Sequence, residues 1–127
     1  MGRAAMTEAP CSLAPMTHAA HGLAIDTEVQ GDVLEVRVRG ELDMSTTPQL
    51  SATLAEAADK AVKEVTLDLA GVTFIDSSAL RVLVLSGRSL AEADRTLQIG
   101  PRSDLVARIL AMTSLDEGSD AFRVLPE

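Results

Sequence analysis

The sequence predicts an α/β domain with a mixed, largely parallel β-sheet and helices packed on it, in the order ββαβαβαβ. Two alternating apolar and polar stretches near the N-terminus predict a β-hairpin, and short apolar strands then alternate with segments of helical periodicity. A Ser, Thr or Asp residue precedes each predicted helix, as expected of N-caps. Strands that are joined through helices run parallel, so the hairpin supplies the antiparallel pair.

The chain has 127 residues, of which 46% are hydrophobic and 24% are charged. That length and balance are typical of one globular domain with its own core. Residues 1–22 are rich in Ala, Pro, Thr, Ser, Met and His without helical or strand periodicity. We therefore expect a disordered N-terminal tail over 1–22 and a folded domain over 23–127.

The predicted hairpin comprises residues 23–29 and 34–38, which alternate with a period of two on either side of Gln30-Gly31-Asp32. The segment 45–48 then supplies a capping residue followed by proline at a first helical position. The helix predicted over 48–61 has apolar residues at spacings of three and four, namely Leu50, Leu54, Ala57, Ala58 and Ala61.

A third strand is predicted over 65–69, and a second helix begins at Asp76-Ser77-Ser78 and continues to about Ala91. Residues 82–85 alone would suit a buried strand, but the preceding Asp and Ser residues and the length of the apolar pattern favour a helix. A fourth strand over 96–99, a third helix capped by Ser103 and a short strand over 122–125 complete the order.

The formal net charge is −8, which disfavours a nucleic-acid partner bound through its phosphates. Cys11 is the single cysteine and cannot form an internal disulfide. The sequence shows no leader pattern and no apolar run long enough to cross a bilayer, so we expect a cytoplasmic protein with no membrane partner.

Catalytic groups are scarce in the predicted domain. Both histidines, His18 and His21, fall in the predicted tail, so no serine of the domain has an imidazole base from the domain itself. The sequence lacks a Walker A loop, a dinucleotide fingerprint and the Cys/His spacings of a metal site. We therefore predict no enzyme activity, no cofactor and no metal.

The segment Asp76-Ser77-Ser78 allows two interpretations. Asp76 or Ser77 is the N-cap of the second helix, which is a common structural role. Alternatively, one hydroxyl is a substrate that another protein phosphorylates. Such a phosphate would act as a switch because it adds roughly −1.5 to −2 charges at one point of the surface. The helix start tolerates an anion, whereas a partner packed against the turn would have to repel or desolvate it.

Three stretches resemble the STAS domain of bacterial anti-sigma factor antagonists: residues 39–43, residues 65–80 and the helix segment 105–110. In those antagonists an Asp-Ser-Ser-Gly-Leu motif carries a serine that is phosphorylated by the anti-sigma factor, a GHKL-type kinase. That serine corresponds to Ser77. The resemblance implies that the unphosphorylated protein binds the anti-sigma factor and frees a sigma factor, that phosphorylation of Ser77 releases it, and that a phosphatase acting on phospho-Ser77 resets the cycle.

The resemblance also implies a partner-binding surface around Ser77. Asp76 would orient the serine, and Ser78 would cap the helix or contact the partner. Ala79 stands where the family usually has glycine, which would restrict close backbone approach at the turn but leave the acceptor hydroxyl in place. Arg81 replaces a residue that is often small, so partner selectivity would differ. The remaining members of the surface are Glu41 and Asp43, which are equally typical of solvated turn residues.

Two other functions remain open from the sequence. The domain could be a non-switching STAS subunit of a larger assembly, such as a stressosome-like complex or a lipid-transport accessory, with Ser77 as a helix cap. It could also be an enzyme that uses Ser77 as a nucleophile, which the missing base disfavours.

Overall fold

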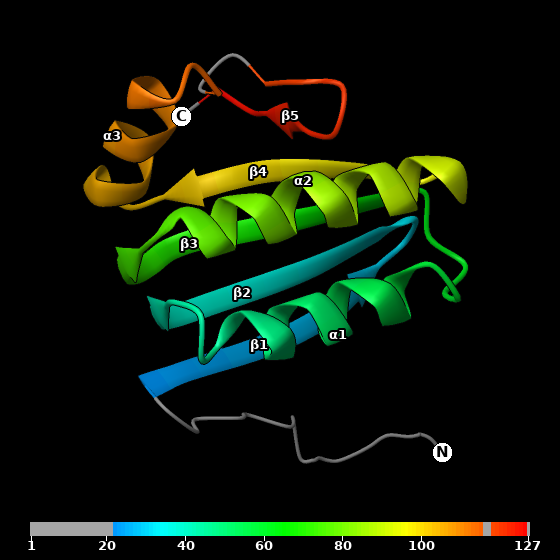
Figure 1. Ribbon diagram of the computed structural model, residues 1–127. Coiled ribbons are helices and arrows are strands. Elements are labelled where there is room, and N and C mark those ends of the chain that lie inside the picture. The colour runs from blue at the N-terminus through cyan, green and yellow to red at the C-terminus, as the bar shows by residue number, and fades with distance from the viewer. Residues whose placement is uncertain (1–21, 116–117, 127) are drawn as a thin grey trace.

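The computed structural model describes residues 22–115 and 118–126 and shows strands alternating with helices in the predicted order (Figure 1). The elements are β1 (Leu23–Gln30), β2 (Val33–Leu42), α1 (Thr47–Ala57), β3 (Glu64–Ile75), α2 (Ser77–Glu92), β4 (Thr96–Arg102), α3 (Asp104–Met112) and β5 (Arg123–Val124). The order ββαβαβαβ is thus confirmed. Residues 1–21 of the tail predicted over 1–22, with Cys11, His18 and His21, lie outside the described residues.

All strands belong to one five-stranded sheet of order β1-β2-β3-β4-β5. The β1–β2 pair is antiparallel and every later pair is parallel, which confirms a mixed, largely parallel sheet. The hairpin turns at Gly31, whose φ of 61° is a left-handed conformation that glycine adopts without steric cost.

Helices α1 and α2 lie side by side across one face of the sheet (Figure 1). Alternate strand residues pack beneath them, because successive side chains of a strand point to opposite faces. The largest fully buried side chains are Leu23, Leu34, Leu42, Leu50, Leu54, Leu67, Leu69, Leu83, Leu90, Leu97, Ile99 and Leu110. This single apolar layer holds the helices on the sheet.

The opposite face of β1 and β2 carries ion pairs. Arg37 contacts Glu28 at 3.5 Å and Glu35 at 2.8 Å, and Arg39 contacts Asp26 at 2.7 Å. These side chains are well exposed or half-exposed, so each pair contributes little to stability. The alternation of the hairpin sequence therefore reflects a buried and a solvated face in β2 and in the first half of β1, whereas residues 27–30 are exposed on both sides, including Val29 at 55%.

Helix α1 ends at Ala57, four residues before the predicted end. The N–H groups of residues 58–60 donate to the carbonyls of residues 55–57, three positions back, so the last turn tightens and the helix stops. Ala61 is exposed beyond it. The prediction of a helix to residue 61 was wrong because the spacing of Ala61 matched the apolar stripe without Ala61 contacting the core.

Strand β3 is longer than the predicted strand over 65–69 and runs to Ile75. Its pairing with β2 shifts register twice, between Arg37 and Arg39 and between Gly40 and Glu41. Such irregularities break the alternation of apolar residues, which is why the pattern identified only the first half of the strand. The extra length places the start of α2 beside the end of β2.

Helix α2 packs closely against the segment that precedes β5. A Cβ atom on Gly87 would overlap the carbonyl oxygen of Ala121 and would also crowd the Ala121 side chain. Only a residue without a side chain allows this approach.

Within the described part of the chain, no helix is both long enough and apolar enough to span a bilayer.

Candidate functional site

The candidate site lies at the edge of the sheet where β2 and β3 both end. Leu42 pairs in register with Ile75, and the N–H of Asp76 donates to the Leu42 carbonyl at 3.2 Å. The loop after β2 and the β3–α2 junction are therefore neighbours at the same end of the molecule (Figure 1). This arrangement brings the predicted residues Glu41 and Asp43 to the edge from which α2 starts.

Asp76 is the N-cap of α2. Its backbone is extended, with φ −125° and ψ −176°, and its Oδ1 accepts the N–H groups of Ser78 at 3.0 Å and Ala79 at 3.3 Å. The hydroxyl of Ser78 donates to the same oxygen at 2.5 Å. The Asp76 side chain thus supplies an acceptor for the Ser78 N–H and a second one for the Ala79 N–H, which also donates to the Asp76 carbonyl at 3.1 Å. Of the two capping candidates, the structure selects Asp76.

The two serines differ in what their hydroxyls do. Ser77 is the first residue of α2 and is exposed to solvent. Its hydroxyl makes no hydrogen bond to any residue in 22–115 or 118–126, whereas the partly buried Ser78 hydroxyl is held by Asp76. Ser77 therefore presents a free hydroxyl with no structural task.

Ala79 and Arg81 point in different directions. Ala79 is fully buried on the core-facing side of α2, so a partner docking on the folded domain does not reach its methyl group. Its backbone is helical, and alanine suits that conformation better than glycine does. Arg81 is exposed one turn after Ser77, and the described residues offer it no ion pair or hydrogen bond.

Asp43 organises the loop between β2 and α1. Its Oδ1 accepts the Ser45 hydroxyl at 2.7 Å, the Ser45 N–H at 2.9 Å and the Thr46 N–H at 3.2 Å. The hydrogen bond from the Ser45 hydroxyl lowers the pKa of Asp43 below its ordinary value of 3.8. Partial desolvation opposes this shift, whereas the backbone N–H groups of Ser45 and Thr46 and the Thr46 hydroxyl add to it. Asp43 therefore keeps its negative charge at mildly acidic pH.

The buried Thr46 side chain stabilises this loop through hydrogen bonds to its backbone, a role that was not predicted from the sequence. It is 1% exposed, donates its hydroxyl to the Glu41 carbonyl at 2.8 Å and accepts the Asp43 N–H at 2.9 Å. Thr46 occupies the N-cap position of α1 without a side-chain capping bond. The expected cap of this helix thus belongs to the loop instead, because its hydroxyl bonds to residues before it.

Two large apolar side chains at this edge were also missed. Met44, in the loop after β2, is 77% exposed, and Phe74, near the end of β3, is 46% exposed. Phe74 pairs in register with Glu41, so both lie on the same side of the sheet. An apolar residue inside the polar turn at 43–46 was the available signal for Met44.

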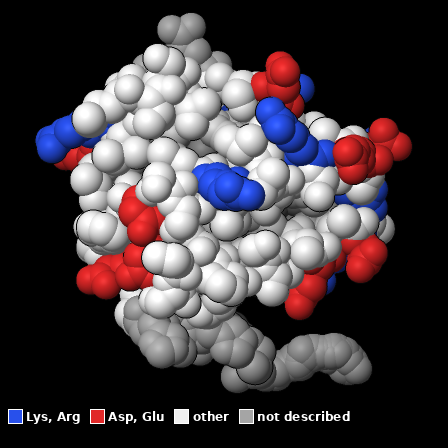
Figure 2. Space-filling model, viewed as in Figure 1, with Lys and Arg blue, Asp and Glu red and all other residues white. Residues whose placement is uncertain are grey.

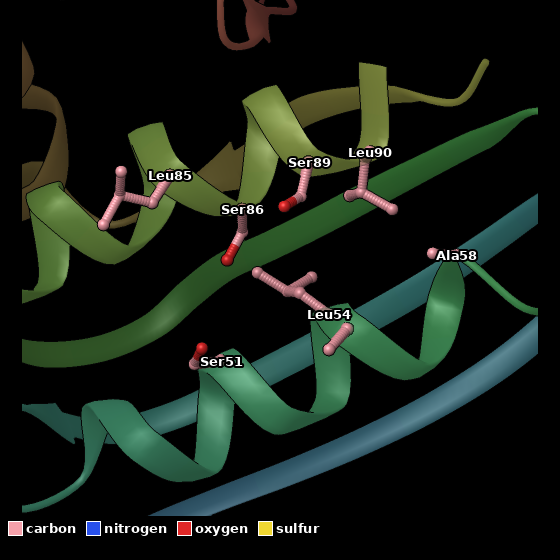
Figure 3. Close-up of a pocket in the computed structure, with 8 residues that line it drawn as sticks. Ser51, Leu54, Ala58, Leu85, Ser86, Ser89 and Leu90 are labelled. Atoms are coloured by element: carbon pink, nitrogen blue, oxygen red, sulfur yellow. The ribbon is translucent and has the colours of Figure 1, made fainter. Parts of the chain in front are cut away.

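A separate shallow groove of about 140 Å³ runs between α1 and α2 (Figure 3). Leucine side chains form part of it and serines and alanines the rest, the lining residues being Ser51, Leu54, Ala55, Ala58, Leu85, Ser86, Ser89 and Leu90. None of the predicted site residues lines it. Around it, basic and acidic side chains are interspersed over a largely uncharged surface (Figure 2).

Chemistry by the domain itself has little support from the geometry. The part of the chain that the structure describes holds no group of three His, Cys, Asp or Glu residues placed to bind a metal ion. The nearest carboxylate in sequence to Ser77 is Asp76, whose Oδ1 already accepts three donors of α2. Within the described residues, neither a metal-binding group nor a disengaged Asp76 Oδ1 stands beside the Ser77 hydroxyl.

The capping assignment makes a stability prediction. We expect Asp76→Ala to lower the free energy of unfolding by about 1 kcal/mol, because the Ser78 N–H loses its acceptor and the Ala79 N–H keeps only the backbone carbonyl of residue 76. Ser77→Ala is expected to change it by no more than about 0.5 kcal/mol, as for other surface positions. Urea denaturation followed by circular dichroism measures both. If Ser77→Ala lowered the free energy of unfolding as much as Asp76→Ala does, the assignment of the cap to Asp76 alone would be contradicted.

Comparison with known proteins identifies the family of the chain. Residues 25–126 match the family described as "Mlab, STAS domain". The anti-sigma-B factor antagonist of Staphylococcus epidermidis is 33% identical over 95 residues, covering 75% of this chain and 88% of the relative. That of Staphylococcus aureus strain NCTC 8325 is 32% identical over the same length.

Solved structures agree. The anti-sigma factor antagonist from Mycobacterium paratuberculosis superposes with a TM-score of 0.70 at 25% identity, covering 83% of this chain and 86% of that one. The antagonist SpoIIAA in its unphosphorylated form has the same fold, with a TM-score of 0.66 at 22% identity over 82% of this chain and 90% of its own. The chain therefore belongs to the STAS-domain family of anti-sigma factor antagonists.

Proposed function

We propose that this protein binds an anti-sigma factor, a GHKL-type serine kinase, while it is unphosphorylated, and that phosphorylation of Ser77 ends the binding. The observation that carries the proposal is the difference between the two hydroxyls: that of Ser77 is exposed and free, while that of Ser78 is bonded to Asp76. The Staphylococcus relatives, which are antagonists by name, support the choice of partner. Binding would release a sigma factor for transcription.

The switch needs no moving domain. A phosphate on Ser77 adds roughly −1.5 to −2 charges at neutral pH. The first turn of α2 tolerates this anion, because it is the positive end of the helix dipole. A partner that covers Met44 and Phe74 would form a dry contact near Ser77, where a phosphate must be desolvated. Each ~1.4 kcal/mol of that penalty weakens binding tenfold.

The other predicted residues fit parts of the same surface. Asp76 fixes the first turn of α2, so the Ser77 hydroxyl is held at one place relative to the domain. Ser78 serves the cap through its bond to Asp76. The negative charges of Glu41 and Asp43 would favour basic groups on the partner.

The proposal describes a cytoplasmic binding protein rather than an enzyme, and a separate phosphatase would remove the phosphate from Ser77. A non-switching STAS subunit of a larger assembly is the alternative. The role that it assigned to Ser77, capping α2, is filled by Asp76. The alternative therefore leaves the exposed Ser77 hydroxyl without a task.

The test is phosphorylation in vitro. We expect candidate anti-sigma kinases with ATP to add one phosphate, which mass spectrometry of peptides locates on Ser77. Ser77→Ala should abolish the modification and Ser78→Ala should retain it. A phosphate found on Ser78 alone, or on neither serine with every anti-sigma kinase of the source organism, would overturn the proposal.

A further inference from the structure

We propose that Arg81 binds the phosphate of phosphorylated Ser77, so that one modification both charges Ser77 and withdraws the Arg81 guanidinium from the partner surface. The regulatory meaning of this pairing rests on the proposed function. The pairing itself is a property of α2, which contains both residues.

The helix places the two side chains together. Ser77 and Arg81 are four residues apart in α2 and both are exposed, so they lie one above the other on the outer side of the helix. Their Cβ atoms are roughly 5–6 Å apart at this spacing. Long side chains of a helix lean toward its N-terminus, which directs the Arg81 guanidinium over the turn that begins with Ser77.

Arg81 is also uncommitted in the unphosphorylated protein. Arg37 and Arg39 pair with carboxylates on the open face of the sheet, but no described residue pairs with Arg81. Its neighbours at three and four positions along α2 are Ser77, Ser78, Val84 and Leu85, none of which is acidic. Asp76 lies five positions away and is occupied as the cap.

A phosphate changes this balance. The neutral Ser77 hydroxyl offers the guanidinium only a weak acceptor, whereas a phosphate presents three oxygens and close to two negative charges. Arginine binds phosphate through two parallel N–H···O bonds, which are stronger than bonds between neutral groups. The negative group lies N-terminal to the positive one, which is the favoured orientation for a pair at this spacing.

The pairing would further weaken the binding of the phosphorylated protein to its partner. In the unphosphorylated protein, Arg81 is free to contact a carboxylate of the partner. After phosphorylation the guanidinium is held over the first turn of α2, so the partner loses that contact in addition to meeting the phosphate.

The test uses protein with phosphoserine encoded genetically at position 77, so no kinase is required. Phosphorus NMR across a pH titration measures the second pKa of the phosphate in the wild type, Arg81→Gln and Arg88→Gln. We expect Arg81→Gln to raise this pKa and Arg88→Gln to leave it unchanged. Arg88 is the matched control. It is exposed on the same helix, but its backbone lies roughly 16 Å from that of Ser77 along the helix axis.

The other charged groups near the phosphate, the carboxylates of Glu41, Asp43 and Asp76, are the same in all three proteins. A difference between the variants therefore reports Arg81 itself. We further expect Arg81→Lys to restore part of the shift and 1 M NaCl to diminish it. Equal pKa values in the wild type and Arg81→Gln would overturn the pairing. Failure of all kinases to modify Ser77 would instead overturn the proposed function.

Discussion

Ser77→Ala is expected to bind the anti-sigma factor whether or not ATP is present, and Ser77→Glu is expected to bind it at least about tenfold more weakly. A tenfold loss corresponds to ~1.4 kcal/mol, which is modest for a charge brought into an interface without a partner. Alanine removes the acceptor hydroxyl but leaves the Asp76 cap intact. Its binding to the partner should therefore match that of the unphosphorylated wild type.

Isothermal titration calorimetry against the purified anti-sigma factor, with and without ATP, measures the effect. Ser89→Glu is the control, since Ser89 is exposed on α2 but lies twelve residues beyond Ser77, beside the α1–α2 groove. It should bind like the wild type if the effect of Ser77→Glu is local. Equal affinities for Ser77→Ala and Ser77→Glu would contradict the switch.

Gly87→Ala is expected to lower the free energy of unfolding by about 1–3 kcal/mol, the usual cost of overpacking a core. In an exposed helix the same change would gain about 1 kcal/mol, because alanine is the better helix former. Here the added methyl group would overlap the Ala121 carbonyl, which belongs to the backbone and cannot rotate away. The steric term should therefore exceed the propensity gain.

Urea denaturation of the wild type, Gly87→Ala and Ser86→Ala measures this prediction. Ser86 is the adjacent, partly exposed residue of α2, and its replacement should change stability by less than about 0.5 kcal/mol. A midpoint for Gly87→Ala at or above that of the wild type would show that the segment around Ala121 moves away from α2 at little cost.

Much of the fold followed from local patterns. The hairpin was predictable because apolar and polar residues alternate on both sides of Gly31, an alternation that matches burial in β2 and in the first half of β1. The start of α2 was predictable because an acidic cap precedes a long apolar stripe. Where packing interrupts the local pattern, prediction was wrong: residues 70–75 continue β3 through register shifts, and α1 stops before Ala61.

The predicted functional roles of the site residues remain predictions. The segment from Asp76 to Ser78 was identified from the sequence, with Ser77 selected by resemblance. Met44 was missed although its apolar side chain stands out in the polar turn at 43–46, because the sequence alone does not show whether a loop methionine is buried or exposed. Thr46 was expected to help start α1, but its hydroxyl is buried against the Glu41 carbonyl.

The sequence by itself determined the order of strands and helices, the position of the α2 start and the absence of an imidazole base from the predicted domain, since these depend on residue type and spacing. Only the tertiary structure decided which residue caps α2 and which hydroxyl is free. That choice depends on the Asp76 backbone, which the Leu42 carbonyl of the neighbouring strand holds in place. Contacts between segments distant in sequence set these roles, because hydrogen bonds form with whichever partner the packed sheet brings within reach.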